Sequence, residues 1–317
     1  MRGTRTAAVL IVATLLGAAA ITPAPAVPVE GSTCEIFPAD NVWHLNVSKL
    51  PVSPRSDVWK RAMHARRTSL HPDFGPPSYG IPFDVVDASH ADVSVAFTYA
   101  DESDPGPYPF GSDTHIEGGS DRHALMLDRD TCTLYELYDA HWNGGSPTAG
   151  SGAVFDLASD ALRPAGWTSA DAAGLPIMAG LLRFDEVASG EVDHAIRVTA
   201  SCTHDAYIWP ARHEAGTTHR RCPPMGARFR LKAGFDARGF SPAARVVITA
   251  MKRYGLIVAD NGSDWYFQGA VDPRWTYAFV DQLKQIPARA FVAIDEHACR
   301  VAPNSGAFAA GPGCPVP

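Results

Sequence analysis

The sequence lacks several features that would place it in a common class of enzyme or membrane protein. After its first 26 residues it has no long apolar run, which disfavours a membrane span, because crossing a bilayer takes about 20 apolar residues. It has no CxxC pair, which disfavours a structural zinc site. It also has no GxSxG, HExxH or GxGxxG motif, so serine esterases, zincins and dinucleotide-binding enzymes lose their usual sequence support.

Positive charge is also scarce. The chain has 27 basic and 34 acidic residues, and two of the basic ones, Arg2 and Arg5, lie in the first 26 residues. Residues 27–317 therefore carry a net charge of 25 − 34 = −9. Since proteins bind a phosphate backbone mainly through clustered Lys and Arg, this balance disfavours nucleic acid as a partner.

The N-terminus has the three-part pattern of a secretory signal peptide. Arg2 and Arg5 precede an apolar run over residues 7–20, and Ala24-Pro25-Ala26 provides the small-residue cleavage pattern. The sequence thus predicts a signal peptide over residues 1–26 and a secreted, extracellular protein that begins at Val27. Residues 27–317 contain no Gly/Ser-rich or Pro/Thr-rich linker, so we expect one globular domain. The sequence leaves the oligomeric state open.

The six cysteines are expected to form disulfides, because their number is even and the chain is expected to be exported. Six cysteines allow 15 connectivities. Proximity in the sequence favours Cys202–Cys222 and Cys299–Cys314. The remaining pair, Cys34–Cys132, would tie the N-terminal arm to a hairpin.

The order of predicted elements favours an α+β fold with an antiparallel, β-rich core, either a sandwich or jelly-roll-like, and several peripheral helices. Apolar alternation predicts strands over residues 81–87, 93–99, 123–128, 133–140, 193–200 and 228–235, and a hairpin over 256–269 around Asn261-Gly262. Helical spacing and caps predict helices that start near Ser56, near Thr168 or Ser169, at Pro242 and at Asp272-Pro273. The second of these helices would continue to Gly190.

The stretch from Asp113 to His141 carries the densest set of groups capable of acid/base or metal chemistry. Its two strands would form a hairpin around Arg129-Asp130. Because side chains alternate along a strand, Glu136 and Tyr138 share one face with Leu134. The sequence therefore predicts a polar cleft beside this hairpin, with residues 141–152 as its lip.

We interpret this cleft as the site of a hydrolase acting on an extracellular polysaccharide, because hydrolysis of a glycosidic bond generally uses two carboxyl groups. Glu117 and Glu136 are the first pair to test, with Asp121 or Asp193 as substitutes. The candidate catalytic residues are Glu117, Glu136, Asp121, His123 and His194. The candidate substrate-binding residues are Tyr138, Trp142, Arg212 and His213.

Three alternatives stay open. A polysaccharide lyase would take its base from His123, His194 or Tyr138 and a cation from Arg197 or Arg212. A metal-dependent hydrolase would bind a divalent metal, the one cofactor considered, through His115, His123 and His194. His213 and either Glu117 or Asp121 would be further ligands. A carbohydrate-binding or cell-envelope protein would use the same exposed aromatic and acidic groups without turnover.

Six further segments resemble a recurrent group of secreted bacterial proteins of the actinobacterial type. They are HPDFGPPSYGIPF, DESDPGPYP, GWTSADAAGLPI, WPARH, PMGARFRLKA and YGLIVADNGSDWY. They are spread over nearly all of the chain after residue 26. The resemblance implies one exported, integrated module and assigns no catalytic residues.

Overall fold

The computed structural model describes residues 27–217 and 219–314. The signal peptide predicted for residues 1–26 lies outside the described residues. The described parts of the chain contain twelve strands and four α-helices, which confirms an α+β fold with a β-rich core. Among these residues, no helix is long and apolar enough to cross a membrane.

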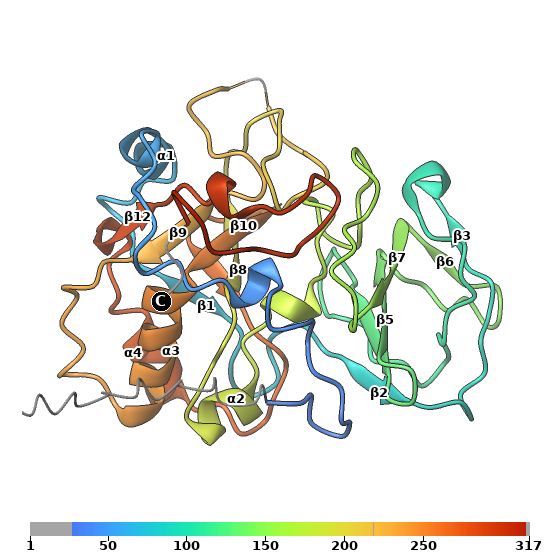
Figure 1. Ribbon diagram of the computed structural model, residues 1–317. Coiled ribbons are helices and arrows are strands. Elements are labelled where there is room, and N and C mark those ends of the chain that lie inside the picture. The colour runs from blue at the N-terminus through green and yellow to red at the C-terminus, as the bar shows by residue number, and fades with distance from the viewer. Residues whose placement is uncertain (1–26, 218, 315–317) are drawn as a thin grey trace, which may run out of the picture.

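The larger sheet has six strands in the order β1-β11-β8-β10-β9-β12 (Figure 1). Its strands are β1 (His71–Asp73), β8 (Ile196–Ala200), β9 (Arg228–Leu231), β10 (Leu256–Asn261), β11 (Tyr266–Gln268) and β12 (Phe291–Ala293). The sheet is mixed, because β1 pairs with β11 and β8 with β10 in parallel, whereas the other pairs are antiparallel. This sheet was expected to be antiparallel but contains two parallel pairs, and the chain makes a long connection between the strands of each.

The hairpin predicted over residues 256–269 is wrong. Both β10 and β11 are strands, but β8 lies between them and pairs with each: Val198 is opposite Val258 on one side and Phe267 on the other. The Asn261-Gly262 turn therefore connects two strands that flank a third. Local turn signals could not reveal this, since the inserted strand comes from about 60 residues earlier in the chain.

The four helices are α1 (Ser56–Ala62), α2 (Phe184–Ser189), α3 (Pro242–Arg253) and α4 (Tyr277–Leu283). The predicted start of α3 is confirmed, because the Ser241 hydroxyl accepts the Ala244 N–H. Gly255, with φ +77°, follows the end of the helix. Helix α4 begins later than expected, with Thr276 as its cap. Helices α3 and α4 pack against each other below the sheet (Figure 1).

The helix predicted from Thr168 or Ser169 to Gly190 is wrong over its first half. In this segment a side chain replaces the backbone carbonyls that would accept the hydrogen bonds of a helix: Asp171 Oδ1 accepts the N–H groups of Ala173 and Leu175. Gly174 has φ +67°, which turns the chain away from a helix. After a single 3-10 turn at Met178–Gly180, the short α2 is the part of the prediction that forms.

The smaller sheet has the order β2-β4-β5-β7, with β2 (Asp84–Val86), β4 (Ala124–Asp128), β5 (Thr133–Tyr138) and β7 (Ser151–Asp156). A separate two-stranded sheet pairs β3 (Ala96–Phe97) with β6 (Thr148–Ala149). The predicted β4–β5 hairpin is confirmed, with Leu125 opposite Glu136 and Leu127 opposite Leu134.

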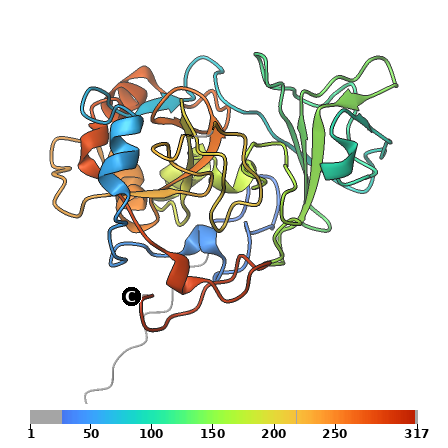
Figure 2. The same ribbon diagram turned by 90° about the horizontal axis from the view of Figure 1, so that it is seen from above.

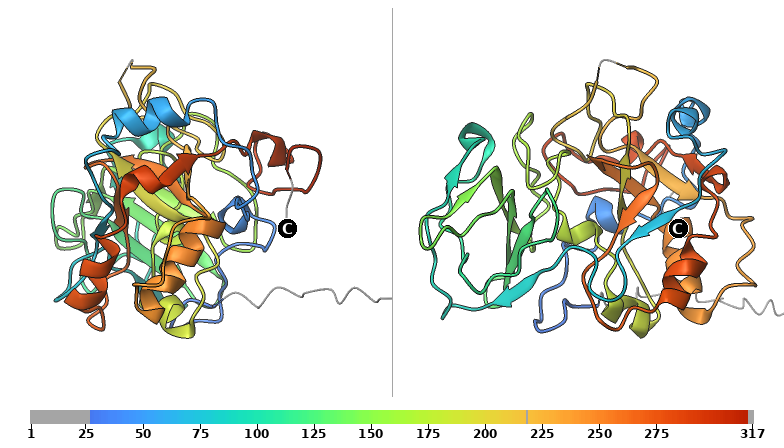
Figure 3. Two further views of the ribbon diagram at one scale, coloured as in Figure 1. Left: turned by 90° about the vertical axis from the view of Figure 1, so that its left-hand side faces the viewer. Right: turned by 180° about the vertical axis from the view of Figure 1, so that it is seen from behind.

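The two larger sheets lie side by side, as the views in Figures 2 and 3 show. One face of the smaller sheet, including Leu125, Leu127 and Leu134, belongs to the same apolar cluster as the larger sheet. The opposite face packs Met126 and Leu137 into a second cluster. Glu136 lies on the same face as Leu134, as predicted, and this face points toward the main core rather than toward solvent.

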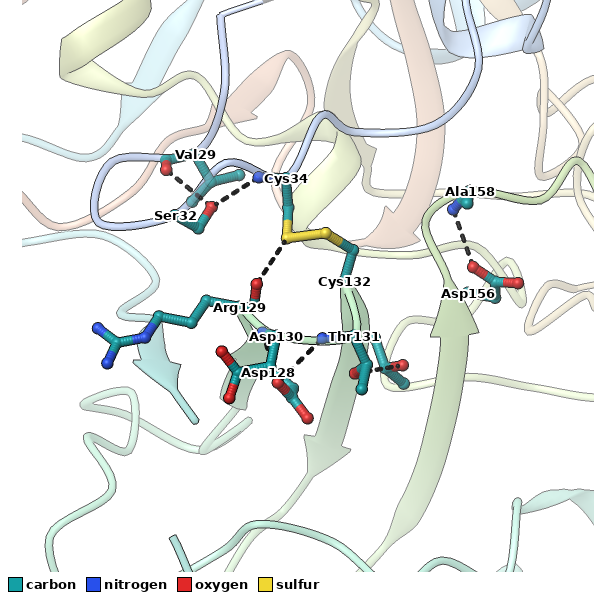
Figure 4. Close-up of a disulfide and its surroundings, with 11 residues drawn as sticks. Val29, Ser32, Cys34, Asp128, Arg129, Asp130, Thr131, Cys132, Asp156 and Ala158 are labelled. Atoms are coloured by element: carbon teal, nitrogen blue, oxygen red, sulfur yellow. Dashed lines mark hydrogen bonds between the residues drawn. A yellow bond between two sulfur atoms is a disulfide. The ribbon is translucent and has the colours of Figure 1, made fainter. Parts of the chain in front are cut away.

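All three predicted disulfides are confirmed: Cys34–Cys132, Cys202–Cys222 and Cys299–Cys314. Figure 4 shows how the first of them fastens the N-terminal arm to the turn between β4 and β5. Val29 and Ile36, on either side of Cys34, are buried in the main core. The arm is therefore part of the folded body and holds the smaller sheet against the larger one.

Candidate functional site

A pocket of about 450 Å³ lies where the smaller sheet meets the larger one. Tyr138 from β5 and Ser151 from β7 form one side of it, and Asp260 and Asn261 at the end of β10 form another. The segments 168–172 and 213–215 complete the wall, together with Tyr99, Glu102 and Asp121. The pocket thus collects polar groups from many parts of the chain.

Five carboxyl groups line this pocket: Glu102, Asp121, Asp171, Glu214 and Asp260. They differ in how far they can reach a bound molecule. The Asp171 side chain is fully buried, and its Oδ1 is occupied by backbone N–H groups. Glu102 accepts the Thr168 N–H and so fixes part of the wall. Asp121 is exposed, and Glu214 and Asp260 are partly exposed, so these three are accessible from the pocket.

The position of Asp260 depends on a β-bulge. The register between β10 and β8 shifts between Val258 and Asp260, which leaves Ala259 as the extra residue. Bulges of this kind redirect the side chains beyond them and are frequent beside active sites. Here the bulge brings Asp260 to the pocket with 21% of its side chain exposed, while Val258 stays in the core.

The surroundings of Asp260 favour its protonated form. Burial is the main cause of its raised pKa, and the negative charge of Asp121 raises the pKa further. The positive charges of Arg197 and His123 act in the opposite direction but do not cancel the shift. Asp260 therefore combines access to the pocket with a carboxyl group that retains its proton to higher pH than an ordinary aspartate.

Arg197 lies beneath the pocket and is fully buried. Its guanidinium is 3.5 Å from Asp171 Oδ2 and 3.5 Å from Asp260 Oδ2, and it also donates to the side-chain oxygen of Gln268. Burial raises the pKa of Asp171 to about 6, although Arg197 lowers it. Arg197 thus holds two carboxyl groups in place from below, and its burial keeps it from contacting a substrate.

His123 is buried behind the pocket wall and bonded through both ring nitrogens. Nδ1 is hydrogen-bonded to Glu117 Oε2, and Nε2 lies 3.1 Å from the Ala170 carbonyl oxygen. A neutral imidazole has a single N–H, so two acceptors require a protonated ring, or else a proton on Glu117. Burial lowers the pKa of His123, but the bond and the charge of Glu117 outweigh it and raise the pKa. The imidazolium positions Ala170 and has no free nitrogen to act as a base.

Tyr138 and His213 present polar groups to the pocket. Burial and the nearby charge of Asp121 raise the pKa of Tyr138, so its hydroxyl remains a hydrogen-bond donor at neutral pH. His213 Nδ1 is 2.9 Å from the Ala172 carbonyl oxygen and must donate to it. Its Nε2, 3.6 Å from Glu102 Oε2, faces the pocket side. Of the residues selected from the sequence, Asp121, Tyr138 and His213 therefore line one cavity.

Glu136 lies outside this cavity and is fully buried. Its Oε2 accepts the Ile177 N–H at 2.8 Å and its Oε1 accepts the Met178 N–H at 2.9 Å. Burial raises the pKa of Glu136 to about 7 against these two bonds. The side chain holds the 3-10 turn at Met178–Gly180 against the smaller sheet, and both of its oxygens are already used.

The remaining selected residues lie in other parts of the molecule. His194 is buried against Glu186 and the Ala195 carbonyl oxygen. Arg212 donates to the backbone oxygens of Arg163 and Pro303 and to the side-chain oxygen of Asn304. Trp142 packs edge-on against Phe110 in the second apolar cluster.

The histidines selected as metal ligands are not brought together. His115 is bonded to Asp84, His123 to Glu117 and His194 to Glu186, each in a different part of the fold. Among residues 27–217 and 219–314, no group of three His, Cys, Asp or Glu side chains is arranged to hold a metal ion.

Sequence reasoning missed Asp260, Glu214 and Glu102 as pocket residues. One signal for Asp260 was present: it ends the buried run Leu256–Ala259, at the point where a strand gives way to a turn. Glu214 and Glu102 belong to loops whose approach to β10 has no local signature. Comparison with protein-family models, with curated proteins and with solved structures yields no match, so the candidate site depends on its own geometry.

Proposed function

We propose that this protein is a secreted hydrolase that cleaves an extracellular polysaccharide in the pocket between the two larger sheets. Asp260 is the general acid, and Asp121 is the carboxylate that acts as base or nucleophile. This pair replaces Glu117 and Glu136, whose side chains are engaged by His123 and by the backbone of residues 177–178. The observation that carries the proposal is the convergence of accessible carboxyl groups with unequal surroundings in one cavity.

The unequal surroundings suit the two roles that glycoside hydrolysis needs. One carboxyl group must hold a proton to donate to the leaving oxygen, and the other must be ionised. The raised pKa of Asp260 fits the first role. Asp121 lines the same pocket and is exposed to solvent, which suits the second role.

Tyr99 and Tyr138 support binding of a sugar. Both line the pocket, and Tyr99 is 53% exposed, which leaves a ring available to pack against a pyranose face. The protonated Tyr138 hydroxyl offers a hydrogen-bond donor to a sugar hydroxyl. The Asn261 side chain is already bonded to the Ala215 carbonyl oxygen and the Thr203 hydroxyl, and so shapes the wall. The three disulfides support an extracellular site of action.

The proposal is tested with a panel of plant, fungal and bacterial polysaccharides, assayed by reducing ends and by ultraviolet absorbance for unsaturated products. We expect reducing ends without absorbance, because hydrolysis adds water and forms no double bond. Asp260→Asn and Asp121→Asn should each lower kcat by about 10²- to 10⁴-fold. Asp281→Asn, at an exposed site on α4, is the control and should retain full activity.

Other outcomes select the alternatives. Unsaturated products would indicate a lyase. Retention on an insoluble glycan without product over long incubation would indicate a binding protein. Loss of activity with a chelator, together with stoichiometric metal by elemental analysis, would indicate a metal-dependent hydrolase. Full activity in both Asp260→Asn and Asp121→Asn would refute the carboxylate assignment, and Glu214→Gln would then be the next variant to measure.

A further inference from the structure

The pocket between the two larger sheets has a one-sided charge. Among the residues that the structure describes, its lining contains five carboxyl groups, one histidine and no Lys or Arg side chain. Arg197 lies beneath the pocket, is fully buried and is shared between Asp171 and Asp260. A molecule in the pocket therefore meets carboxyl groups on several sides and His213 as the one basic side chain of the described lining.

Negative charge reaches across the pocket from one wall to another. Burial is the main cause of the raised pKa of both Asp260 and Tyr138, and the charge of Asp121 raises each of these pKa values further. The charge of Asp139, the residue after Tyr138, also contributes to the raised pKa of Tyr138. Because charges interact strongly in a partly enclosed site, this pocket favours a cationic ligand and disfavours an anionic one.

The 3-10 turn at Ala100–Glu102 brings an aromatic ring and a carboxyl group to this pocket together. Tyr99 precedes the turn, Glu102 ends it, and both line the pocket. Tyr99 is 53% exposed and the Glu102 side chain is 38% exposed. An exposed ring offers an apolar face to the C–H groups of a sugar, and both a carboxylate and a ring face attract an ammonium group. The two side chains therefore suit a sugar that carries a free amino group.

The turn is held in place by neighbouring segments. The Glu102 carbonyl oxygen accepts a hydrogen bond from Arg163, and the Ser103 hydroxyl donates to the Tyr99 carbonyl oxygen. Both contacts of the Glu102 carboxylate with described residues use Oε2, which accepts the Thr168 N–H and lies 3.6 Å from His213 Nε2. This leaves Oε1 for a ligand, on a side chain whose position is already fixed.

A basic peptide is the other extended cationic ligand to consider, and the wall of the pocket disfavours it. Extended peptides commonly bind by adding a strand to an open sheet edge. Strand β7 is the edge strand of the smaller sheet on the side of the pocket, but the segment 103–104 covers it. The Gly152 N–H donates to Ser103 Oγ, and the Val154 N–H donates to Asp104 Oδ2. The Gly152 carbonyl oxygen accepts the Asp104 N–H, so this part of β7 offers a peptide no open edge.

We propose that the polysaccharide bound in this pocket is built from amino sugars whose amino groups are free, and that Glu102 binds the ammonium group of a sugar packed on Tyr99. This inference rests on the proposed glycan-cleaving function of the same pocket and names its substrate class. Asp260 and Asp121 keep their roles at the scissile bond, whereas Glu102 determines specificity. An N-acetylated sugar lacks the charge that Glu102 recognises, and a uronate carries the opposite charge.

The test compares ligands that share a backbone and differ in charge. Calorimetry measures the binding of glucosamine oligomers and of N-acetylglucosamine oligomers of the same length, in slightly acid buffer that keeps the sugar amines protonated. The protein is the full chain with Asp260→Asn, which prevents cleavage and is neutral, as the protonated acid is. Oligogalacturonate and oligolysine serve as the anionic and the peptide comparison. We expect the glucosamine oligomer to bind at least about 10-fold more tightly than the acetylated one, with an affinity that falls as salt rises.

A second substitution in this background assigns the recognition to Glu102. Glu102→Gln keeps an oxygen for the Thr168 N–H but removes the charge, so it should weaken glucosamine binding by about 10-fold. Binding of the acetylated oligomer should change less than about 3-fold. Asp101→Asn is the matched control, because Asp101 is the exposed residue next to Glu102 and lies outside the pocket lining. It should change both affinities less than about 3-fold. A thermal unfolding curve for each variant separates lost binding from lost folding.

Binding and cleavage are measured separately, so the two proposals fail in different ways. If the glucosamine oligomer binds as expected but the wild type releases no reducing ends from it, the substrate class stands and the hydrolase activity is refuted. If the wild type cleaves a neutral or anionic polysaccharide and the glucosamine oligomer does not bind, the hydrolase activity stands and the substrate class is overturned. Equal affinity for both oligomers, tighter binding of oligolysine, or equal losses in Glu102→Gln and Asp101→Asn would also overturn it.

Discussion

Replacing Glu136 with glutamine separates a structural role of this residue from a catalytic one. In the folded protein each carboxylate oxygen accepts one backbone N–H, from Ile177 and from Met178. Glutamine has one oxygen and one NH₂ group, so one of the two N–H groups would face a donor. In a site with no exposed surface, losing that acceptor costs about 1–3 kcal/mol.

The effect depends on pH in a direction that the structure determines. Burial raises the pKa of Glu136 from 4.5 to about 7, so the folded state binds this proton more tightly than the unfolded chain does. The contribution of Glu136 to stability is therefore largest below pH 4.5 and falls as the pH rises toward 7. Each unit of difference between the folded and unfolded pKa corresponds to about 1.4 kcal/mol, so the total loss is about 3 kcal/mol. Glutamine does not ionise and escapes this loss. The stability advantage of the wild type should thus shrink by about 3 kcal/mol between pH 4.5 and pH 8.

Urea unfolding followed by tryptophan fluorescence, repeated at several pH values, gives the free energy of unfolding of the wild type and of Glu136→Gln. The contributions of the other titrating groups cancel in the difference between these two free energies. Glu35→Gln, at an exposed site, should show a difference near zero at every pH. A constant difference between pH 4.5 and pH 8 would refute the argument about the buried carboxylate. Loss of glycan cleavage per folded molecule in Glu136→Gln would show that the residue also serves the reaction.

Two further predictions concern stability. Replacing Cys34 and Cys132 with alanine should lower the free energy of unfolding by about 2–5 kcal/mol, since the bridge closes a loop with a sequence separation of 98; a loss below about 1 kcal/mol in urea unfolding would contradict this. Burial lowers the pKa of His194, but the charge and the hydrogen bond of Glu186 outweigh it and raise the pKa above 6.5. The protonated ring therefore stabilises the fold fully below pH 6.5, and this stabilisation is lost as the pH rises through the raised pKa. In NMR spectra the His194 ring should still be protonated at pH 6.5; a neutral ring there would contradict hydrogen bonds from both ring nitrogens to Glu186 and the Ala195 carbonyl oxygen.

Much of the fold could be predicted where the signals are local. The cap at Ser241, the β4–β5 hairpin and the pairing of neighbouring cysteines depend on residues close in sequence. Two elements failed because distant or side-chain partners decide them. Asp171 captures backbone N–H groups that a helix would have used, and β8 inserts between β10 and β11.

The candidate site was predictable to a similar extent. Strand parity correctly placed Glu136 and Tyr138 on one face. Strand parity cannot tell whether that face meets solvent or another layer of the protein. In the structure, residues 177–178 cover Glu136, whereas Tyr138 on the same face reaches the pocket. Asp260 enters the pocket through a β-bulge, which depends on the register between two strands that are far apart in sequence.

The disulfide between Cys34 and Cys132 also determines what happens when the backbone is cut. The loop that it closes contains β1, β2, β3 and most of the chain before the β4–β5 hairpin, including the exposed residues 105–107. A protease that cleaves once within this loop leaves both fragments covalently joined. The N-terminal fragment also stays bound through Val29 and Ile36 in the core. A single nick therefore releases no part of the smaller sheet.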